Sequence, residues 1–159
     1  MEKFVNLKHQ TFQCNMTRIN SAIPVKNLTD EHLLAEHREI KRLPSQMKKS
    51  HGNLSFAPFK FALGKGHVLF FLDKQLFIRK RYIVLYKECL NRGFKVEDYS
   101  ENWCYVKPEY MNDYEPTEEE RKMLVERIKD RIVNGKKAYY HYYGRQISKE
   151  EAVALLKSF

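Results

Sequence analysis

Apolar residues recur at helical spacing over residues 73–91, the clearest periodic stretch of the chain. The apolar series consists of Leu72, Leu76, Ile83, Tyr86 and Leu90. Steps of three, four and seven residues place side chains on one face of an α-helix. Gly93 follows at a position where glycine commonly caps a helix. We therefore predict a helix over 73–91.

Three further helices are predicted from their N-terminal caps. Thr29 can cap a helix over residues 30–42, and Pro44 argues for a stop soon afterwards. Two capping boxes, each a Ser or Thr followed three residues later by Glu, open the other helices. These pairs are Thr117 with Glu120 and Ser148 with Glu151. The helix after Thr117 is expected to run to Val133, and the last helix to be short.

No long alternation of apolar and polar residues competes with these helices as a strand pattern. The connections over 44–66 and 94–116 are long for a small domain. The motif GKGHV at 64–68 lacks the spacing of a phosphate-binding loop, so we interpret it as a turn entering the second helix. A chain of 159 residues has room for one core. We predict an all-α fold, with a single compact domain of three main helices plus a short C-terminal helix and long ordered loops.

Charge is distributed unevenly along the chain. Lys and Arg number 29 against 20 Asp and Glu, which gives a net charge of +9. Residues 74–95 contain seven Lys or Arg and one acid, whereas residues 113–120 contain five acids and no base. Clustered positive charge, together with 13% aromatic residues, favours a polyanion such as nucleic acid as the partner.

Cysteine usage and apolar run lengths indicate a cytoplasmic protein. Cys14, Cys89 and Cys104 are odd in number and have no C-x-x-C spacing, so neither a disulfide framework nor a zinc site is expected. The first 15 residues lack an apolar run of signal-peptide length. No window approaches the roughly 18 apolar residues of a membrane span.

The polar face of the first predicted helix carries a carboxylate among cations. A helical wheel gives this face Glu31, His32, Ala35, Glu36, Arg38, Glu39 and Arg42. Glu39 lies between Arg38 and Arg42 on one flank and His32 on the other. A solvated face laced with salt bridges is one interpretation. The alternative is a phosphate-binding surface beside a reacting centre, which two arginines and a histidine around one acid would suit.

Five blocks of the sequence resemble one known family. They are MTRIN at 16–20, DEHLLAEHREIKRLP at 30–44, LGKGHVLFFLDK at 63–74, LYKECLNRGF at 85–94 and YYHYYGR at 139–145. In this order and spacing they resemble the pyrimidine-dimer DNA glycosylases of the phage endonuclease V type. The resemblance implies an all-helical enzyme, without metal or cofactor, that excises cyclobutane pyrimidine dimers and then cuts the resulting abasic site.

The resemblance also assigns two catalytic residues. The family's nucleophile, the amino group of an N-terminal threonine, corresponds to Thr17, and its catalytic glutamate corresponds to Glu39. An α-amino group has a pKa of about 7.8, against about 10.4 for lysine, so far more of it is neutral and able to attack near pH 7. In the printed chain the nitrogen of Thr17 is an amide. Translation that begins at Met16 with later removal of this methionine, cleavage of residues 1–16, or an inactive chain are the three possibilities. We expect a start at Met16, with 16–159 as the glycosylase domain and 1–15 as an extension outside the active enzyme.

Substrate-binding positions of the family correspond to Arg18, Glu31, His32, Arg38 and Arg42. Glu31 stands where glutamine is usual in the family. In the third helix, Arg127 and Arg131 either follow the DNA backbone or form ordinary surface charge one turn apart. Tyr142 and Tyr143 are expected to line the lesion site, and the alternative has the tyrosines of 138–145 closing the core beneath the first helix.

The expected partner is double-stranded DNA that contains pyrimidine dimers or abasic sites, bound by a monomer that has no contact with a membrane. One alternative is a damaged-DNA-binding protein without catalysis, in which the N-terminal extension blocks the amine. Another is a basic structural or RNA-associated helical protein. This hypothesis explains the charge but not the joint occurrence of the Thr-Arg start at 17–18 with His32, Arg38 and Glu39.

Overall fold

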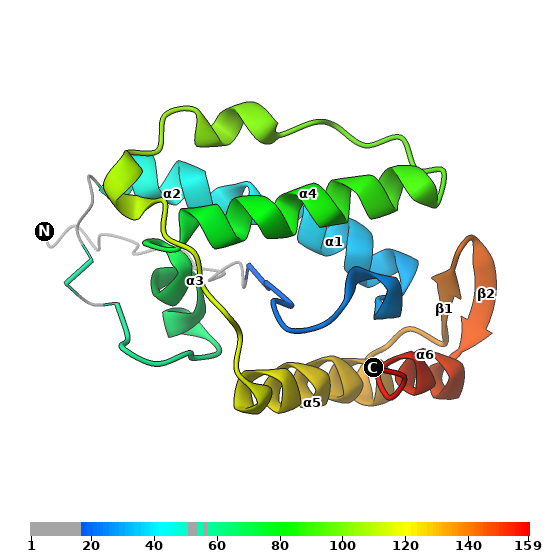
Figure 1. Ribbon diagram of the computed structural model, residues 1–159. Coiled ribbons are helices and arrows are strands. Elements are labelled where there is room, and N and C mark those ends of the chain that lie inside the picture. The colour runs from blue at the N-terminus through cyan, green and yellow to red at the C-terminus, as the bar shows by residue number, and fades with distance from the viewer. Residues whose placement is uncertain (1–16, 51–53, 56) are drawn as a thin grey trace, which may run out of the picture.

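The computed structural model describes residues 17–50, 54–55 and 57–159, and it is mainly helical (Figure 1). Its elements in chain order are η1 (Val25–Asn27), α1 (Asp30–Ile40), α2 (Arg42–Ser50), α3 (Lys65–Phe71), α4 (Gln75–Asn91), η2 (Ser100–Trp103), η3 (Pro108–Tyr110), α5 (Glu118–Asn134), β1 (Tyr139–Tyr142), β2 (Arg145–Ser148) and α6 (Lys149–Leu155). The prediction of a compact, mainly helical domain is confirmed. The predicted extension 1–15, with Cys14, lies outside the described residues.

Helix α4 lies at the centre of the fold and packs against α1, α2, η1 and η2. Figure 1 shows α5 running below α4, while the segment of residues 92–111 passes above it. The hairpin of β1 and β2 stands beside the start of α1, with α6 next to it. Ile40, Tyr82 and Leu124, from α1, α4 and α5, belong to one core cluster and are at most 1% exposed. These three helices therefore share a single core.

Helix α4 ends as its sequence predicts. Gly93 has a φ of 82°, a value that glycine adopts without the steric cost of a Cβ atom. The N–H of Phe94 donates to Cys89 O and the N–H of Gly93 to Leu90 O, both at 2.9 Å. These two bonds are those of a Schellman motif.

The first helix ends before Pro44, as predicted, but no loop begins at Pro44. Helix α1 ends at Ile40, Lys41 forms a turn, and α2 begins at Arg42 with Pro44 in its first turn. Proline is tolerated there because the first N–H groups of a helix have no carbonyl partner within the helix. The polypeptide thus continues as a second helix into the region that was predicted to be a loop.

The motif at 64–68 was also misread, because its residues start helix α3 rather than a turn. His67, Phe70 and Phe71 are buried and follow the helical spacing of three and four residues. Phe71 packs edge-on against Phe61 and His67. The apolar spacing of HVLFF is therefore typical of a helix, and the comparison of this motif with phosphate-binding loops did not take it into account.

An antiparallel hairpin near the C-terminus was not predicted. Tyr139 pairs with Ser148 and Tyr142 with Arg145, which leaves Tyr143 and Gly144 as the turn. Their φ values of 50° and 76° are those of a two-residue type I′ turn. Asn-Gly is the usual signal for such a turn, so Tyr-Gly within a tyrosine-rich run gave little indication of it.

Candidate active site

Three consecutive backbone N–H groups hold the first described residues in place. The N–H of Arg18 donates to Glu39 Oε2 at 3.1 Å, that of Ile19 to His67 Nε2 at 3.0 Å, and that of Asn20 to Glu36 Oε1 at 3.1 Å. Ile19 is fully buried in the core. Side chains from α1 and α3 therefore fix the backbone of 18–20, a segment that forms no helix or strand of its own.

A buried ion pair lies next to this segment and binds it. Arg81 donates two hydrogen bonds to the Glu36 carboxylate, from Nε at 2.8 Å and from Nη2 at 3.0 Å, and both side chains are at most 7% exposed. Arg81 Nη1 also donates to Ile23 O at 2.7 Å, and Asn20 Nδ2 donates to Glu36 Oε2 at 3.0 Å. A buried charge is tolerated when it is paired and hydrogen-bonded in this way. Glu36 was predicted to lie on the polar face of its helix, and its buried role was not predicted.

His67 was overlooked as a site residue, and it acts here as a neutral hydrogen-bond acceptor. Its Nδ1 lies 3.0 Å from Ala62 O, which can only accept, so Nδ1 carries the proton and Nε2 is free to accept the Ile19 N–H. Burial, together with the nearby Arg127 guanidinium, lowers the pKa of His67 to about 4. The imidazole is therefore neutral at pH 7.

Glu39 lies beside the backbone of Thr17. The nitrogen of Arg18, which Glu39 binds, is separated from the nitrogen of Thr17 by three covalent bonds, so the carboxylate lies within a few ångströms of the Thr17 main chain. Thr17 itself is 4% exposed. Burial lowers the pKa of the Arg18 guanidinium, and the Glu39 charge opposes this. The two predicted catalytic residues and Arg18 thus meet in one place.

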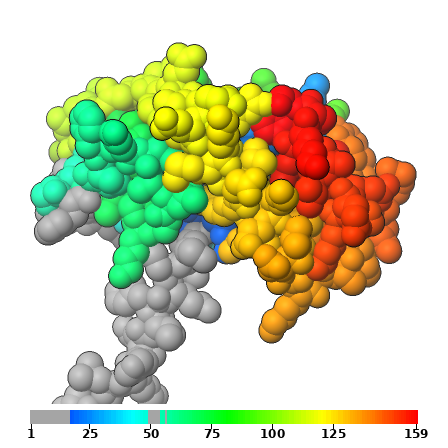
Figure 2. Space-filling view, turned by 90° about the horizontal axis from the view of Figure 1, so that it is seen from below, coloured from blue at the N-terminus to red at the C-terminus, as the bar shows by residue number. Residues whose placement is uncertain are grey.

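A cleft of about 460 Å³ separates α1 from the C-terminal half of α5. Its lining includes four of the predicted binding residues, namely Arg18, Glu31, His32 and Arg131. Ala35 supplies a small side chain on the α1 wall, as the wheel indicated. Figure 2 shows residues from the blue end of the colour bar at the surface between the green segment and α5.

His32 is held neutral in this cleft. Its Nδ1 lies 2.8 Å from Thr29 Oγ1, and its ring stacks on Tyr140 with 5.5 Å between ring centroids. Burial lowers the pKa of His32 to about 4, which outweighs the opposing effect of the Glu31 charge. His32 therefore offers a polar ring to a ligand at pH 7 rather than a positive charge.

Arg127 reaches into the protein instead of lying along its surface. Its Nη2 donates to Asn20 Oδ1 at 3.2 Å, and its buried Nε has no hydrogen-bond partner. Burial lowers the pKa of Arg127 to about 10, although the charge of Glu36 opposes this. The side chain stays cationic at pH 7 close to the fixed backbone of 18–20, whereas Arg131, one turn later, lines the cleft.

Tyr142 and Tyr143 lie on the hairpin, where both contact Arg92. The Arg92 guanidinium lies 5.0 Å from the Tyr142 ring centroid and 4.6 Å from that of Tyr143. Tyr143 Oη donates to Glu88 Oε1 at 2.7 Å, and the Tyr143 N–H donates to Asp30 Oδ1 at 3.1 Å. These contacts attach the hairpin to the end of α4 and to the start of α1. A role of either tyrosine at the lesion stays a prediction.

The remaining predicted binding residues differ in their surroundings. Arg38 and Arg42 are exposed. Glu31 is bound on both oxygens by His141, with the backbone N–H at 3.0 Å and Nδ1 at 2.7 Å.

Within the described part of the chain, no three His, Cys, Asp or Glu side chains are grouped so that they could hold a metal ion.

Comparison with known protein families matches residues 16–102 to the family described as pyrimidine dimer DNA glycosylase, more than half of the 159-residue chain. The chain belongs to this family. Membership in the pyrimidine dimer DNA glycosylases implies a role in DNA repair and damaged DNA as the substrate. The net charge of +9 suits that polyanion.

The matched segment of this pyrimidine dimer DNA glycosylase begins at Met16 and contains Glu39, His67 and Arg81. Helix α5, the hairpin and α6 follow the match, so the positions of Arg127 and Arg131 come from the structure alone. Among the described residues, no helix has both the length and the apolar character needed to cross a membrane.

Proposed function

We propose that this pyrimidine dimer DNA glycosylase excises UV-induced cyclobutane dimers by N-glycosylase action and then cleaves the abasic site by β-elimination, with the amino group of Thr17 as nucleophile. The observation that supports this most is the row of three N–H bonds at 18–20, which holds the backbone next to Thr17 against Glu39. Reacting groups that are fixed before the substrate arrives lower the orientational cost of the reaction.

The proposed chemistry begins with attack of the neutral Thr17 amine on C1′ of the damaged nucleotide. The N–C1′ bond forms as the glycosidic bond breaks, and the base leaves with its electron pair and a proton. Opening of the sugar ring gives a protonated Schiff base on Thr17. Removal of a C2′ proton then expels the 3′ phosphate and cuts the strand. Glu39 stabilises the cationic sugar and transfers the protons.

Binding of the DNA falls to the cationic residues around this centre. Arg18 and Arg131 line the cleft, and the exposed Arg38 and Arg42 follow along α1 and α2. Guanidinium groups bind phosphate oxygens through two parallel N–H bonds and so orient a strand as well as attract it. We propose that these arginines position the damaged strand so that its C1′ faces Thr17.

The mechanism requires a free amine at Thr17. An amide nitrogen has no available lone pair, so residues 16–159 are proposed as the translated catalytic domain, from which Met16 is then removed, and 1–15 as an extension that is absent from the active form. A second candidate function is damaged-DNA binding without catalysis. It is supported by the printed sequence, in which the nitrogen of Thr17 is bonded to Met16.

Incision of a duplex that carries a single thymine dimer tests this proposal. The chain that begins at Thr17 is expected to cut the dimer-containing strand, whereas the 159-residue chain leaves it intact. Glu39→Gln in the shorter chain is expected to slow incision by roughly a hundredfold or more. Glu126→Gln, a change at an exposed position of α5, serves as the matched control. The proposal fails if the shorter chain binds the duplex without cutting it, or if both lengths cut at the same rate.

A further inference from the structure

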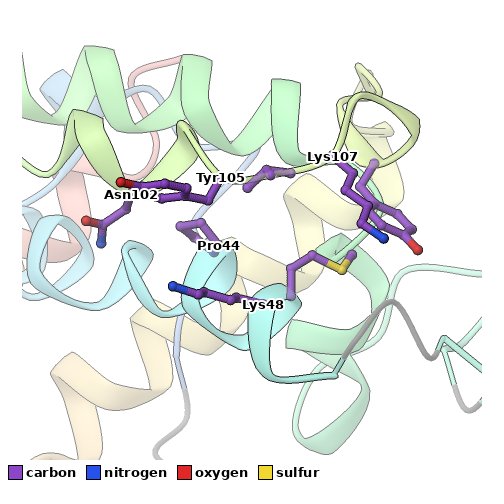
Figure 3. Close-up of a pocket in the computed structure, with 8 residues that line it drawn as sticks. Pro44, Lys48, Asn102, Tyr105 and Lys107 are labelled. Atoms are coloured by element: carbon purple, nitrogen blue, oxygen red, sulfur yellow. The ribbon is translucent and has the colours of Figure 1, made fainter.

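A groove lies between helix α2 and the segment that carries η2 and η3 (Figure 3). Its smaller part, of about 190 Å³, has Pro44 and Lys48 of α2 on one side and Tyr105 and Lys107 on the other. The groove continues past Asn102, which lines both of its parts, along the first turn of α2. The family match ends at residue 102, so Tyr105 and Lys107 are features of this chain beyond the matched region.

The groove has a strongly positive lining. Its cations are Lys41, Arg42, Lys48 and Lys107, and Glu97 is its acid. None of the four cations has an ion-pair partner among the salt bridges of the described residues. Unpaired cations on both walls of a groove attract a chain of negative charges such as a phosphate backbone.

An exposed aromatic ring stands in the same groove. Tyr105 is 78% exposed, although tyrosine normally buries much of its ring. The Lys48 ammonium lies 5.2 Å from its ring centroid, and further along the groove Lys41 lies 4.1 Å from the centroid of Tyr99. Aromatic rings interleaved with cations are the usual means by which proteins bind unpaired nucleic acid, because bases stack on the rings while the cations follow the phosphates.

We propose that this groove binds an unpaired stretch of DNA beside the lesion, with its phosphates on the lysine and arginine side chains and a base stacked on Tyr105. A base inside an intact duplex has both faces covered by its neighbours, so only an unpaired base can use the ring. This inference rests on the proposed function, because the groove binds the same DNA on which the active site acts.

The position of the groove fits a strand that leaves the active site. Arg42 follows Glu39 by three residues across the turn at Lys41, so their Cα atoms are at most about 11 Å apart. Lys48 lies six residues further along α2, about 9 Å. Both residues therefore lie within about six nucleotides of Glu39, at 3.4 Å per nucleotide along a strand. The groove is therefore expected to hold nucleotides close to the damaged sugar rather than a remote part of the DNA.

Fluorescence anisotropy of the full 159-residue chain tests the inference, because binding does not require a free Thr17 amine. Two labelled duplexes with a tetrahydrofuran abasic analogue are compared, one fully paired around the analogue and one with a short unpaired flank. Tyr105→Leu is expected to weaken binding to the flanked duplex by roughly tenfold, as for the loss of one stacked base. Its effect on the paired duplex should be under about twofold.

Tyr139→Leu provides the matched control, because Tyr139 is 47% exposed on β1 and lies outside the groove. It should leave binding to both duplexes unchanged. Three results overturn the inference: equal losses on both duplexes with Tyr105→Leu, no loss on either, or an unmodified chain that binds the two duplexes equally well. Failure of the incision assay with this discrimination intact would instead reject the proposed catalysis and leave the groove in place.

Discussion

His67 accepts the Ile19 N–H because its other ring nitrogen is occupied by Ala62 O. This arrangement requires the tautomer that is protonated at Nδ1. Burial keeps the ring neutral by lowering the pKa of His67 to about 4. Below pH 6.5 the unfolded chain binds this proton and the folded chain does not, so the contribution of His67 to stability is present above pH 6.5 and is lost as the pH falls towards 4. A single neutral ring thus holds Ile19, the residue that follows the Arg18 N–H bound by Glu39.

Replacing His67 should affect catalysis more than substrate binding. His67→Leu removes the acceptor of the Ile19 N–H and should lower the free energy of unfolding by about 1–3 kcal/mol, the cost of an unsatisfied buried donor. Because Thr17 loses its fixed position, kcat for abasic-site cleavage should fall by roughly tenfold with KM little changed. His67→Gln can still accept at the Nε2 position and should recover part of both losses. Equal rates for the two variants would contradict a positioning role.

At the scale of elements, most of the helices could be predicted and their connections could not. Caps and apolar spacing gave α1, α4, α5 and α6 because both signals lie within each helix. The Glu36–Arg81 pair joins residues 45 positions apart, so no local pattern reveals that a carboxylate on the polar face of α1 is buried. The same holds for His67, which can be found only when α3 is placed against the 18–20 backbone. Thr17 and Glu39, by contrast, were identified from sequence blocks and lie together.

The start of α5 carries a buried carboxyl with a measurable pH effect. Burial raises the pKa of Glu120 from 4.5 to about 7, against the opposing effects of the Thr117 N–H and Lys74, and its Oε2 has no hydrogen-bond partner. The folded chain therefore holds a proton that the unfolded chain has released, so stability falls as the pH rises from 4.5 through 7.

Glu120→Gln should remove this dependence, because the amide fills the same space without ionising. We expect the variant to be more stable than the unmodified chain at pH 8, on the order of 1 kcal/mol, with the difference shrinking by pH 5. Urea denaturation at both pH values measures the difference in the free energy of unfolding between the two chains. Glu119→Gln, at the exposed neighbouring position, is the control and should show no such trend. A variant that is less stable than the unmodified chain at pH 8 would show that Glu120 is bound as a carboxylate.

For the whole molecule, charge and fold act together on a DNA substrate. The net charge of +9 is a property of composition, but the structure decides which cations face the site. Arg81 and Arg92 form internal ion pairs, whereas the exposed Arg42 lines the groove. Counting cations in the sequence therefore overstates how many of them are available to bind DNA.

Arg42 and a distant cation should differ in the salt dependence of DNA binding. Each phosphate contact contributes about −0.9 to the slope of log K against log salt, so Arg42→Gln should reduce the magnitude of that slope by about 1. Lys157→Gln, at an exposed position after α6, should leave the slope unchanged. Equal slopes for both variants would mean that Arg42 makes no phosphate contact.

The proposed catalysis depends on a covalent intermediate between the amine of Thr17 and the damaged sugar, formed beside Glu39. Borohydride reduction of the Thr17-started chain on an abasic-site duplex, followed by mass spectrometry of the digested adduct, locates this bond. We expect the reduced sugar on the peptide that begins at Thr17, and no adduct from the 159-residue chain. An adduct on a lysine, or an equal yield from the longer chain, would contradict the proposed catalysis.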